Sequence, residues 1–322
     1  MKIAFFLGEF PAISQTFVLD QIVGLTQQGH QVDIFANVAG NKDTVHPEIE
    51  QYNLLERTHY WPKVPKNYPL RVLKGLKLIA FNIFKDPWLL LNSLNILKYG
   101  KNAASFRLLY LCIPFLNRRA CYDIIQCHFG WSGLQGMHVR NIGAAEGRLI
   151  TTFHGFDITK SVREFGESVY SSLFLEGDLF NPISDYWKCK LIQMGCDERK
   201  VIVHRMGIDL TKFSTSAPYK REYSDRVRLV SVSRLVEKKV LEYGIRAVAK
   251  LLRERNITNI EYTIVGDGNL MTELQQLISD LGISENITLW GQKNSDDVAD
   301  LLNQSHILLA PSVTSKDGDM EG

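Results

Sequence analysis

Ile260-Glu-Tyr-Thr-Ile-Val-Gly266-Asp-Gly268 joins an apolar run to a Gly-x-Gly turn, and an amphipathic stretch follows from residue 270 to Gly282. The apolar run predicts a buried strand, and the stretch after it predicts a helix that a glycine ends. The start of such a helix offers unpaired N–H groups and a positive dipole end to a negatively charged ligand. Gly266, Asp267 and Gly268 are therefore candidate binding residues. A tight strand-to-helix turn explains the glycines equally well.

The same plan extends along the chain in both directions. In the C-terminal part, strands are predicted at 227–233, 287–290 and 306–310, and a helix from 241. In the N-terminal part, a first helix is predicted at 16–28, and apolar runs lie at 2–8, 31–36, 123–128, 149–155, 178–184 and 200–206. Strands that alternate with helices form parallel sheets covered on both faces. The predicted fold class is α/β, with doubly wound, Rossmann-like parallel sheets.

A length of 322 residues exceeds the usual size of one hydrophobic core, so two domains are expected. A polar, irregular stretch at 210–226 interrupts the alternation and indicates the boundary. The predicted domains are residues 1–212 and 213–322. The first of them carries a basic helical insertion at 57–119.

This insertion holds twelve Lys or Arg residues and one acid, Asp86, which gives a local formal charge of +11 in a chain of net charge +2. Aromatic residues are interspersed among the basic ones. Such a segment suits a surface that contacts anionic lipid headgroups or an anionic acceptor. A pair of ordinary amphipathic helices with solvated lysines is the alternative, and the sequence does not separate the two. No nucleic-acid-binding motif is present, and no apolar run is long enough to span a bilayer.

The five cysteines form no Cys-x-x-Cys pair, and their odd number argues against a disulfide framework. The N-terminal run from Met1 lacks the long apolar region and cleavage site of a signal peptide. Both features favour a reduced, cytoplasmic protein.

Two basic side chains follow the predicted strand 227–233. Arg234 and Lys239 would share the carboxyl edge of the sheet with Gly266, where ligands of open parallel sheets collect. Arg can hold phosphate oxygens with two parallel hydrogen bonds, and Lys adds a mobile point charge. Pairing of these side chains with local acids such as Glu237 is the alternative.

Three further positions lie in the N-terminal half. His154 follows a buried strand beside a glycine, where an imidazole can donate a hydrogen bond to an oxygen that gains charge. His128 ends the neighbouring predicted strand, in either a structural or a functional role. Ser14 is a candidate N-cap of the first helix.

Taken together, these motifs resemble the family 4, or group 1, retaining glycosyltransferases, which have two Rossmann-like domains facing a cleft (GT-B). The resemblance is closest to glycosyltransferases of colanic acid and exopolysaccharide biosynthesis. The motifs are His128-Phe-Gly-Trp131, Thr152-Phe-His154-Gly, Ser231-Val-Ser-Arg234-Leu-Val-Glu-Lys-Lys239, Ile264-Val-Gly266-Asp-Gly268, Ile287-Thr-Leu-Trp-Gly291 and Val313-Thr-Ser-Lys-Asp-Gly-Asp-Met-Glu321-Gly.

The resemblance implies an acceptor-binding first domain and a second domain that binds a nucleotide-sugar donor. It places Glu321 near the donor sugar and His154 at the donor sugar or its diphosphate. It assigns donor binding to Arg234 and Lys239 with the Gly266–Gly268 turn. It also gives Gly8, with Ser14 and His128, to a loop that lets donor and acceptor approach. One departure is Val240, because the family usually has glycine after the lysine.

The implied reaction moves a sugar from a nucleotide-sugar donor to a saccharide or lipid-linked acceptor, with retention of anomeric configuration. No cofactor or metal is expected, since the eight histidines lack ligand spacing and no Asp-x-Asp directly follows a predicted strand as in the metal-dependent glycosyltransferases of the other fold. The 57–119 insertion would then face the membrane or the acceptor, which makes the enzyme peripheral on the cytoplasmic membrane face.

The family has a second Glu shortly after the first, and here the sequence stops at Gly322. The expectation is therefore a hexosyltransferase whose second domain is incomplete and whose activity is impaired. Two alternatives stay open. One is a non-catalytic remnant that binds saccharide or membrane, and the other is a sugar-nucleotide epimerase of the same GT-B architecture.

Overall fold

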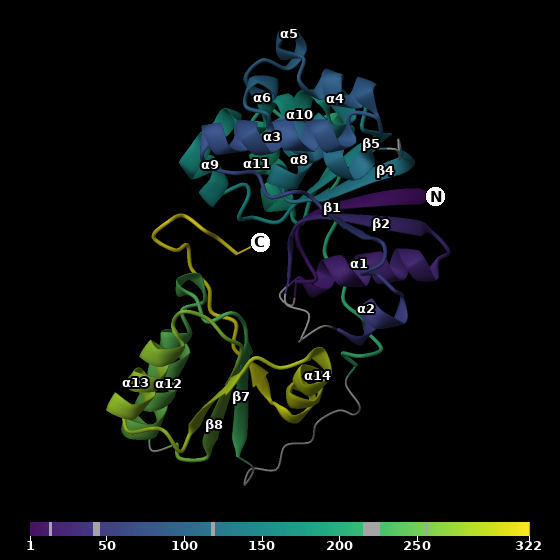
Figure 1. Cartoon of the computed structure of the whole chain (residues 1–322). Coiled ribbons are helices and arrows are strands. Elements are labelled where there is room, and N and C mark those ends of the chain that lie inside the picture. Colours follow the sequence, from purple (N-terminus) through teal and green to yellow (C-terminus); the bar gives the residue numbers. More distant parts are fainter. Residues whose placement is uncertain (13–14, 41–45, 117–119, 215–225, 256, 322) are drawn as a thin grey trace. The chain divides into compact units, whose positions relative to one another are not determined.

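The computed structural model describes residues 1–12, 15–40, 46–116, 120–214, 226–255 and 257–321. They form two compact units, Met1–Gly207 and Ile208–Glu321 (Figure 1). The division therefore lies a few residues before the predicted boundary at 212. Each unit has its own parallel sheet and its own core, so each is described by itself.

The first unit is built on a six-stranded sheet of order β3-β2-β1-β4-β5-β6, in which every neighbouring pair is parallel. This order reverses direction between β1 and β4, as in doubly wound folds that bind ligands at the reversal. The strands are β1 (Lys2–Phe10), β2 (Gln31–Ala39), β3 (Thr58–Tyr60), β4 (Ala120–His128), β5 (Ala145–Phe153) and β6 (Leu179–Pro182).

Alternate residues of β1 face two different layers. Ile3, Phe5 and Leu7 pack in the core with α1 (Thr16–Gln27) and α2 (Pro47–Gln51). Phe6 points the other way, toward Trp61 and Phe115, with ring centroids 5.1 and 6.2 Å away. Figure 1 accordingly shows α1 and α2 on one side of the sheet and α8 (Gly130–Asn141) on the other. Further helices cover its far end: α9 (Lys160–Phe165), α10 (Ser171–Glu176) and α11 (Asp185–Gln193).

The 57–119 insertion is helical after β3, as predicted. Its helices are α3 (Tyr68–Asn82), α4 (Pro87–Ser93), α5 (Ile96–Tyr99), α6 (Lys101–Ala104) and α7 (Arg107–Cys112). The side chains of Asn67, Asp86 and Asn95 cap the N-termini of α3, α4 and α5. Across the described parts of the chain, no helix combines the length and apolar character needed to cross a bilayer.

The second unit has a four-stranded parallel sheet of order β10-β7-β8-β9. Its strands are β7 (Val227–Val232), β8 (Ile260–Val265), β9 (Ile287–Gly291) and β10 (Ile307–Leu308). Helices α12 (Leu241–Glu254) and α13 (Met271–Asp280) bury Ile245, Val248 and Leu274 in one core. In Figure 1, α14 (Ser295–Gln304) lies on the opposite face of this sheet.

The prediction of a strand at 200–206 is wrong, because a single β-bridge, between Phe180 and Val201, links this segment to the rest of the described chain. The segment does run beside β6, since Ile202 and His204 donate to the carbonyl oxygens of Phe180 and Pro182. Pro182 has no N–H to return a hydrogen bond, so the ladder stops.

Candidate functional site

The sheet of the second unit reverses its order between β7 and β10. The segments that follow these two strands, 233–240 and 309–321, meet at this edge. The N–H of Val313 donates to the carbonyl oxygen of Lys238 at 2.9 Å, and the N–H of Lys316 donates to Glu237. The reversal point of an open parallel sheet is where ligands bind, so this edge is the candidate site of the second unit.

Two lysines and two acids join these segments. The ammonium of Lys238 lies 3.0 Å from Asp319 and 3.9 Å from Glu321, and Lys239 forms an ion pair with Glu321. The side chain of Lys238 is 7% exposed and that of Lys239 is 23% exposed. Lys238 is thus a buried anchor for the 313–321 segment, while Lys239 stays accessible.

Sequence reasoning singled out Lys239 and missed Lys238. One unaligned sequence does not tell which of two adjacent lysines is buried. The structure also pairs Asp319 with Lys238, a contact that the sequence analysis did not predict. Asp319 lies in a turn, in which the Ser315 N–H donates to the carbonyl oxygen of Asp319 at 3.0 Å.

Arg234 is exposed at the same edge of the sheet. Its guanidinium makes no hydrogen bond or ion pair with another described residue, so the alternative of a pairing between Arg234 and Glu237 does not form there. A guanidinium without a partner among the described residues, in the same segment as an accessible lysine, favours the binding of a ligand with more than one negative charge.

The Gly266–Gly268 turn packs against the segment that carries Arg234. A Cβ on Gly266 would lie 1.9 Å from the carbonyl oxygen of Ser233, and one on Gly268 would lie 2.3 Å from that of Leu235. The carbonyl oxygen of Asp267 accepts from the Leu235 N–H at 2.9 Å. The lack of a side chain at these glycines therefore lets the turn pack directly against the segment that carries Arg234. The sequence analysis did not predict this contact.

Val240 adopts a left-handed backbone conformation, with φ 34° and ψ 43°, directly before α12. Such a φ is unfavourable for a β-branched residue and natural for glycine. This is the position at which the sequence departs from the glycine that its resemblance implies. The valine follows the backbone path that a glycine would take there.

Replacing Val240 with glycine is expected to raise the free energy of unfolding by about 0.5–1 kcal/mol. Relief of the left-handed conformation contributes ~1–2 kcal/mol, and the greater freedom of glycine in the unfolded chain offsets part of it. Urea denaturation measures the change. Val236→Gly is the matched control, because Val236 has an extended backbone, φ −130°, and its replacement is expected to destabilise. Equal destabilisation by both variants would contradict the prediction.

The first unit brings His128 and His154 together at the reversal between β1 and β4. Nδ1 of His128 lies 3.0 Å from Nε2 of His154, and the rings are stacked with centroids 5.2 Å apart. His128 is fully buried and His154 is partly buried. Burial lowers the pKa of His154 to about 4 and that of His128 well below its usual value. Both rings are therefore neutral at pH 7.

Asp157 holds the backbone around His154 in place, and sequence reasoning assigned it no role. Its carboxylate is fully buried and accepts from the N–H groups of Gly130, His154 and Gly155 at 2.9, 3.0 and 3.1 Å. Burial raises its pKa to about 6, and these hydrogen bonds oppose the rise. An Asp three residues after a strand-end His is a signal that could have pointed to it.

Replacing Asp157 with asparagine is expected to lower the free energy of unfolding by about 2–3 kcal/mol. The amide nitrogen must face at least one buried N–H group, which then loses a hydrogen bond to a charged acceptor. Urea denaturation measures the loss. Asp185→Asn is the control, since that side chain is 73% exposed and its change should stay below about 1 kcal/mol. Equal stability of the two variants would contradict the expectation.

The predicted loop at Gly8 is wrong, because Gly8 lies inside β1. Residues on both sides of it pair with β2, Leu7 with Ala36 and Glu9 with Val38, so the ladder continues to Phe10. A Cβ on Gly8 would meet no atom within 4 Å. Ser14 lies outside the described residues, and Gln15 takes the N-cap position of α1.

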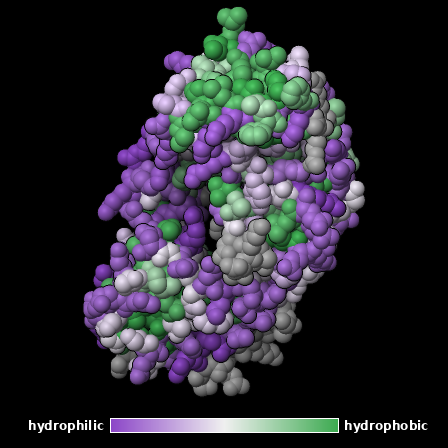
Figure 2. Space-filling model, viewed as in Figure 1, coloured by the Kyte–Doolittle hydropathy of each residue, from purple (hydrophilic) through white to green (hydrophobic). Residues whose placement is uncertain are grey.

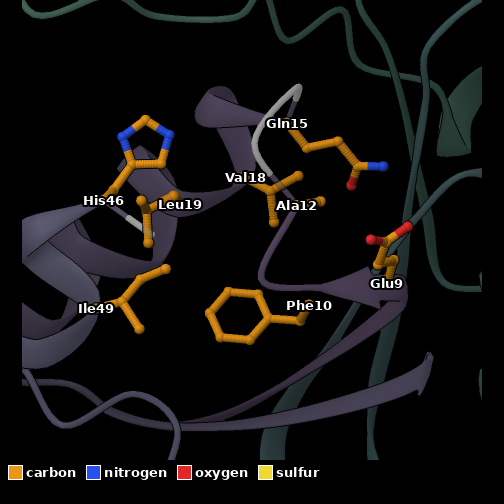
Figure 3. A pocket seen from close by; sticks show the side chains of 8 residues that line it. All are labelled: Glu9, Phe10, Ala12, Gln15, Val18, Leu19, His46 and Ile49. Carbon is orange, nitrogen blue, oxygen red and sulfur yellow. The ribbon is translucent and has the colours of Figure 1, made fainter. Parts of the chain in front are cut away.

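A small pocket lies where β1 ends, between the start of α1 and α2 (Figure 3). It is lined by Glu9, Phe10, Ala12, Gln15, Val18, Leu19, His46 and Ile49. Most of these side chains are apolar, and Glu9 and His46 are the titratable groups among them. Among the side chains that the structure describes, no group of three His, Cys, Asp or Glu residues is arranged to hold a metal ion.

Comparison with known proteins gives the family. The model of "Glycosyl transferases group 1" matches residues 215–322. The chain is 35% identical to WcaL of Escherichia coli, a glycosyltransferase named for colanic acid biosynthesis, and 35% identical to the amylovoran biosynthesis glycosyltransferase AmsK of Erwinia amylovora. Each match covers 100% of this chain and 78% of the relative.

Two more distant similarities agree with this. The UDP-Gal:alpha-D-GlcNAc-diphosphoundecaprenol alpha-1,3-galactosyltransferase of Escherichia coli is 25% identical over 62% of this chain and 54% of its own length. The crystal structure of Anabaena HepE with UDP-glucose matches with a TM-score of 0.62 and 16% identity, over 98% of this chain and 75% of HepE. The latter shows that the two units have the fold of GT-B glycosyltransferases. This chain belongs to the group 1 glycosyltransferases and is similar over its whole length to those of exopolysaccharide biosynthesis.

Proposed function

We propose that this glycosyltransferase takes its sugar from a nucleotide-sugar donor and passes it to a saccharide or lipid-linked acceptor, with retention of anomeric configuration. The observation that carries the proposal is the charge arrangement at the β7–β10 edge. There Arg234 is exposed and has no partner in the described part of the chain, and Lys239 is accessible beside Glu321. Support comes from HepE, which was solved with UDP-glucose, and from the relative named for a diphosphoundecaprenol acceptor.

Arg234 and Lys239 would act on the nucleoside diphosphate that leaves when the sugar bond breaks. The guanidinium can bind two phosphate oxygens, and the ammonium can neutralise the charge that develops on the leaving oxygen. Lys239 now pairs with Glu321. A diphosphate would compete for this lysine and release the Glu321 carboxylate toward the sugar. Since two cations supply the positive charge, we propose that transfer requires no metal.

The test is nucleotide release from a panel of UDP-, GDP- and ADP-sugars, in EDTA, with a lipid-linked saccharide extract as acceptor. Release that depends on the acceptor and persists in EDTA would support the proposal. The anomeric configuration of the product, read by NMR, tests retention. An epimerised nucleotide sugar without transfer would favour the epimerase, and absence of any turnover by the folded chain would favour a binding remnant.

We further propose that the 57–119 insertion docks on an anionic membrane surface. Helix α3 turns apolar side chains outward, with Leu73 and Leu76 55% and 53% exposed, while Arg71 on its other side is buried. The Arg71 guanidinium donates to three backbone carbonyl groups, those of Pro65, Lys66 and Ser105. The helix is thus fixed with its apolar side to the solvent.

Further exposed apolar residues continue this surface into α4 and α5. In Figure 2, hydrophobic residues gather at the end of the unit where Figure 1 shows these helices. Exposed lysines surround them, and a mixed apolar and basic surface is typical of helices that lie in the lipid headgroup region. The exposed members are Tyr68, Leu70, Leu73, Leu76, Phe81, Phe84, Trp88, Leu91, Ile96 and Leu97, with Lys66, Lys74, Lys77, Lys85, Lys98 and Lys101.

The chain is expected to sediment with phosphatidylglycerol-containing vesicles and less with pure phosphatidylcholine vesicles. Replacing Phe81 and Phe84 with serine should lower binding at least about tenfold, because each ring contributes ~1.5–3 kcal/mol when buried. Leu175→Ser is the control, since Leu175 is 80% exposed in α10, outside the insertion. Equal binding of both variants would contradict membrane docking, as would a dimer, seen by light scattering, that masks the surface.

A further inference from the structure

A row of three side chains leads from α1 to the candidate site of the first unit. Gln21 Oε1 on α1 lies 2.9 Å from Nε2 of His128, and Nδ1 of His128 lies 3.0 Å from Nε2 of His154. His128 ends β4 and His154 follows β5, two neighbouring strands of the sheet. The row therefore connects a helix residue to His154 through one fully buried imidazole.

Both imidazoles are neutral, so each carries one ring proton and one bare nitrogen. The surroundings favour this state. His128 lies against the ring of Phe5, with centroids 5.9 Å apart, and His154 lies between Phe17 and Phe129, with centroids 4.8 and 4.6 Å away. Apolar rings cannot solvate a charged imidazolium, and a proton on either histidine would repel one on the other.

Hydrogen bonding along the row then sets which nitrogen of each ring is protonated. The Gln21 oxygen only accepts, so Nε2 of His128 must donate to it. Nδ1 of His128 is consequently bare and must accept, and the donor is the Nε2–H of His154. We propose that Gln21 and His128 are positioning residues that hold His154 in its Nε2–H tautomer, with a bare Nδ1 that accepts a hydrogen bond from a sugar hydroxyl.

This inference rests on the proposed glycosyl transfer and specifies which group His154 contacts. A bare Nδ1 can accept from a hydroxyl, but it cannot donate to a phosphate oxygen. Nδ1 of His154 has no partner among the described residues. The structure thus favours contact with a sugar hydroxyl over the donating role toward a charged oxygen that the sequence led us to expect.

The deciding experiment is long-range ¹H–¹⁵N NMR of the full chain at pH 7 without substrate. The signals of His154 are assigned by their loss in His154→Gln. A protonated Nε2 and a bare Nδ1 are expected, and a protonated Nδ1 would overturn the proposal. Because this measurement uses no substrate, its result is independent of whether the chain transfers sugar from any donor of the release panel.

A matched pair of variants tests the role of Gln21. Gln21→Glu keeps an accepting oxygen. The same NMR spectra show whether His128 stays neutral beside the carboxylate, and with a neutral His128 the tautomer of His154 should persist. Gln21→Met has similar length and no strong acceptor, so the ring proton of His154 should distribute over both nitrogens. With the donor that the release panel identifies, kcat/KM should fall about tenfold in Gln21→Met and stay within about threefold in Gln21→Glu. Equal NMR spectra and equal kinetics of the two variants would overturn the role of Gln21.

Discussion

Replacing Lys239 with alanine is expected to lower kcat/KM for nucleotide release by about 10²–10³-fold. Loss of one preorganised group that stabilises developing charge commonly has an effect of this size. The fall should appear mainly in kcat, because the leaving diphosphate carries more charge at the glycosidic oxygen in the transition state than in the bound donor. Steady-state kinetics with the donor found by the release panel measure it.

The free energy of unfolding distinguishes the role of Lys239 from that of Lys238. Lys239 is 23% exposed, so its removal should change the free energy of unfolding by less than about 1 kcal/mol. Lys238→Ala leaves Asp319 largely buried without its 3.0 Å partner and should cost about 3–5 kcal/mol. If Lys239→Ala were as unstable as Lys238→Ala, or as active as the unmodified chain, Lys239 would be a structural residue.

Glu321→Gln distinguishes two roles for the acid that pairs with Lys239. A carboxylate that acts at the donor sugar should reduce kcat when it is neutralised. A carboxylate that only occupies Lys239 in the absence of donor should, when neutralised, free the lysine and lower KM with kcat unchanged. The first result is expected, and the second would remove Glu321 from the catalytic residues.

The parallel sheets were predictable because buried strands and amphipathic helices alternate with clear turns. Gly282 predicts a left-handed turn at the end of α13, and the apolar run at 260–265 predicts the strand β8. The structure contains both. The predictions that fail are those in which contacts between residues far apart in the sequence determine the local structure. Gly8 belongs to β1 because β2 is long enough to pair beyond it, and residues 200–206 fail as a strand because Pro182, on another strand, lacks an N–H.

The sequence predicted which residues lie at the candidate site better than it predicted the contacts that they make. Arg234, Lys239 and His154 stand at strand ends, a position that a strand pattern gives directly. The burial of Lys238 depends on Asp319, far along the chain, and the role of Asp157 depends on the N–H of Gly130. Contacts across such sequence separations leave no periodic signal in a single sequence.

The histidine pair predicts how stability depends on pH. The pKa of His154 falls from an ordinary value of 6.5 to about 4 on folding. Between these values the unfolded chain binds more protons than the folded chain, so the free energy of unfolding rises with pH. The contribution is fully present above pH 6.5 and is lost as the pH falls toward 4, by about 3 kcal/mol at ~1.4 kcal/mol per unit. His128 acts in the same direction.

Asp157 makes the free energy of unfolding fall as the pH rises, over part of the same pH range. Its pKa rises to about 6 on folding, so its contribution is present below its ordinary value of 3.8 and is lost as the pH rises through 6. In the unmodified chain, the free energy of unfolding would therefore depend on pH less steeply than the histidines alone would make it. His154→Gln removes one histidine and retains Asp157, so the difference between the two chains removes the contribution of Asp157 and reports on His154 and its interaction with His128.

The stability advantage of the unmodified chain over His154→Gln is therefore expected to shrink by about 2–3 kcal/mol between pH 7 and pH 4.5. Glutamine can still donate to Nδ1 of His128 from the position of Nε2, which keeps that hydrogen bond in both chains. Urea denaturation at a series of pH values measures the difference. A difference that stays constant with pH would mean that His154 binds a proton as readily in the folded chain as in the unfolded one. In that case the neutral, stacked imidazole pair on which the bare Nδ1 depends would not exist.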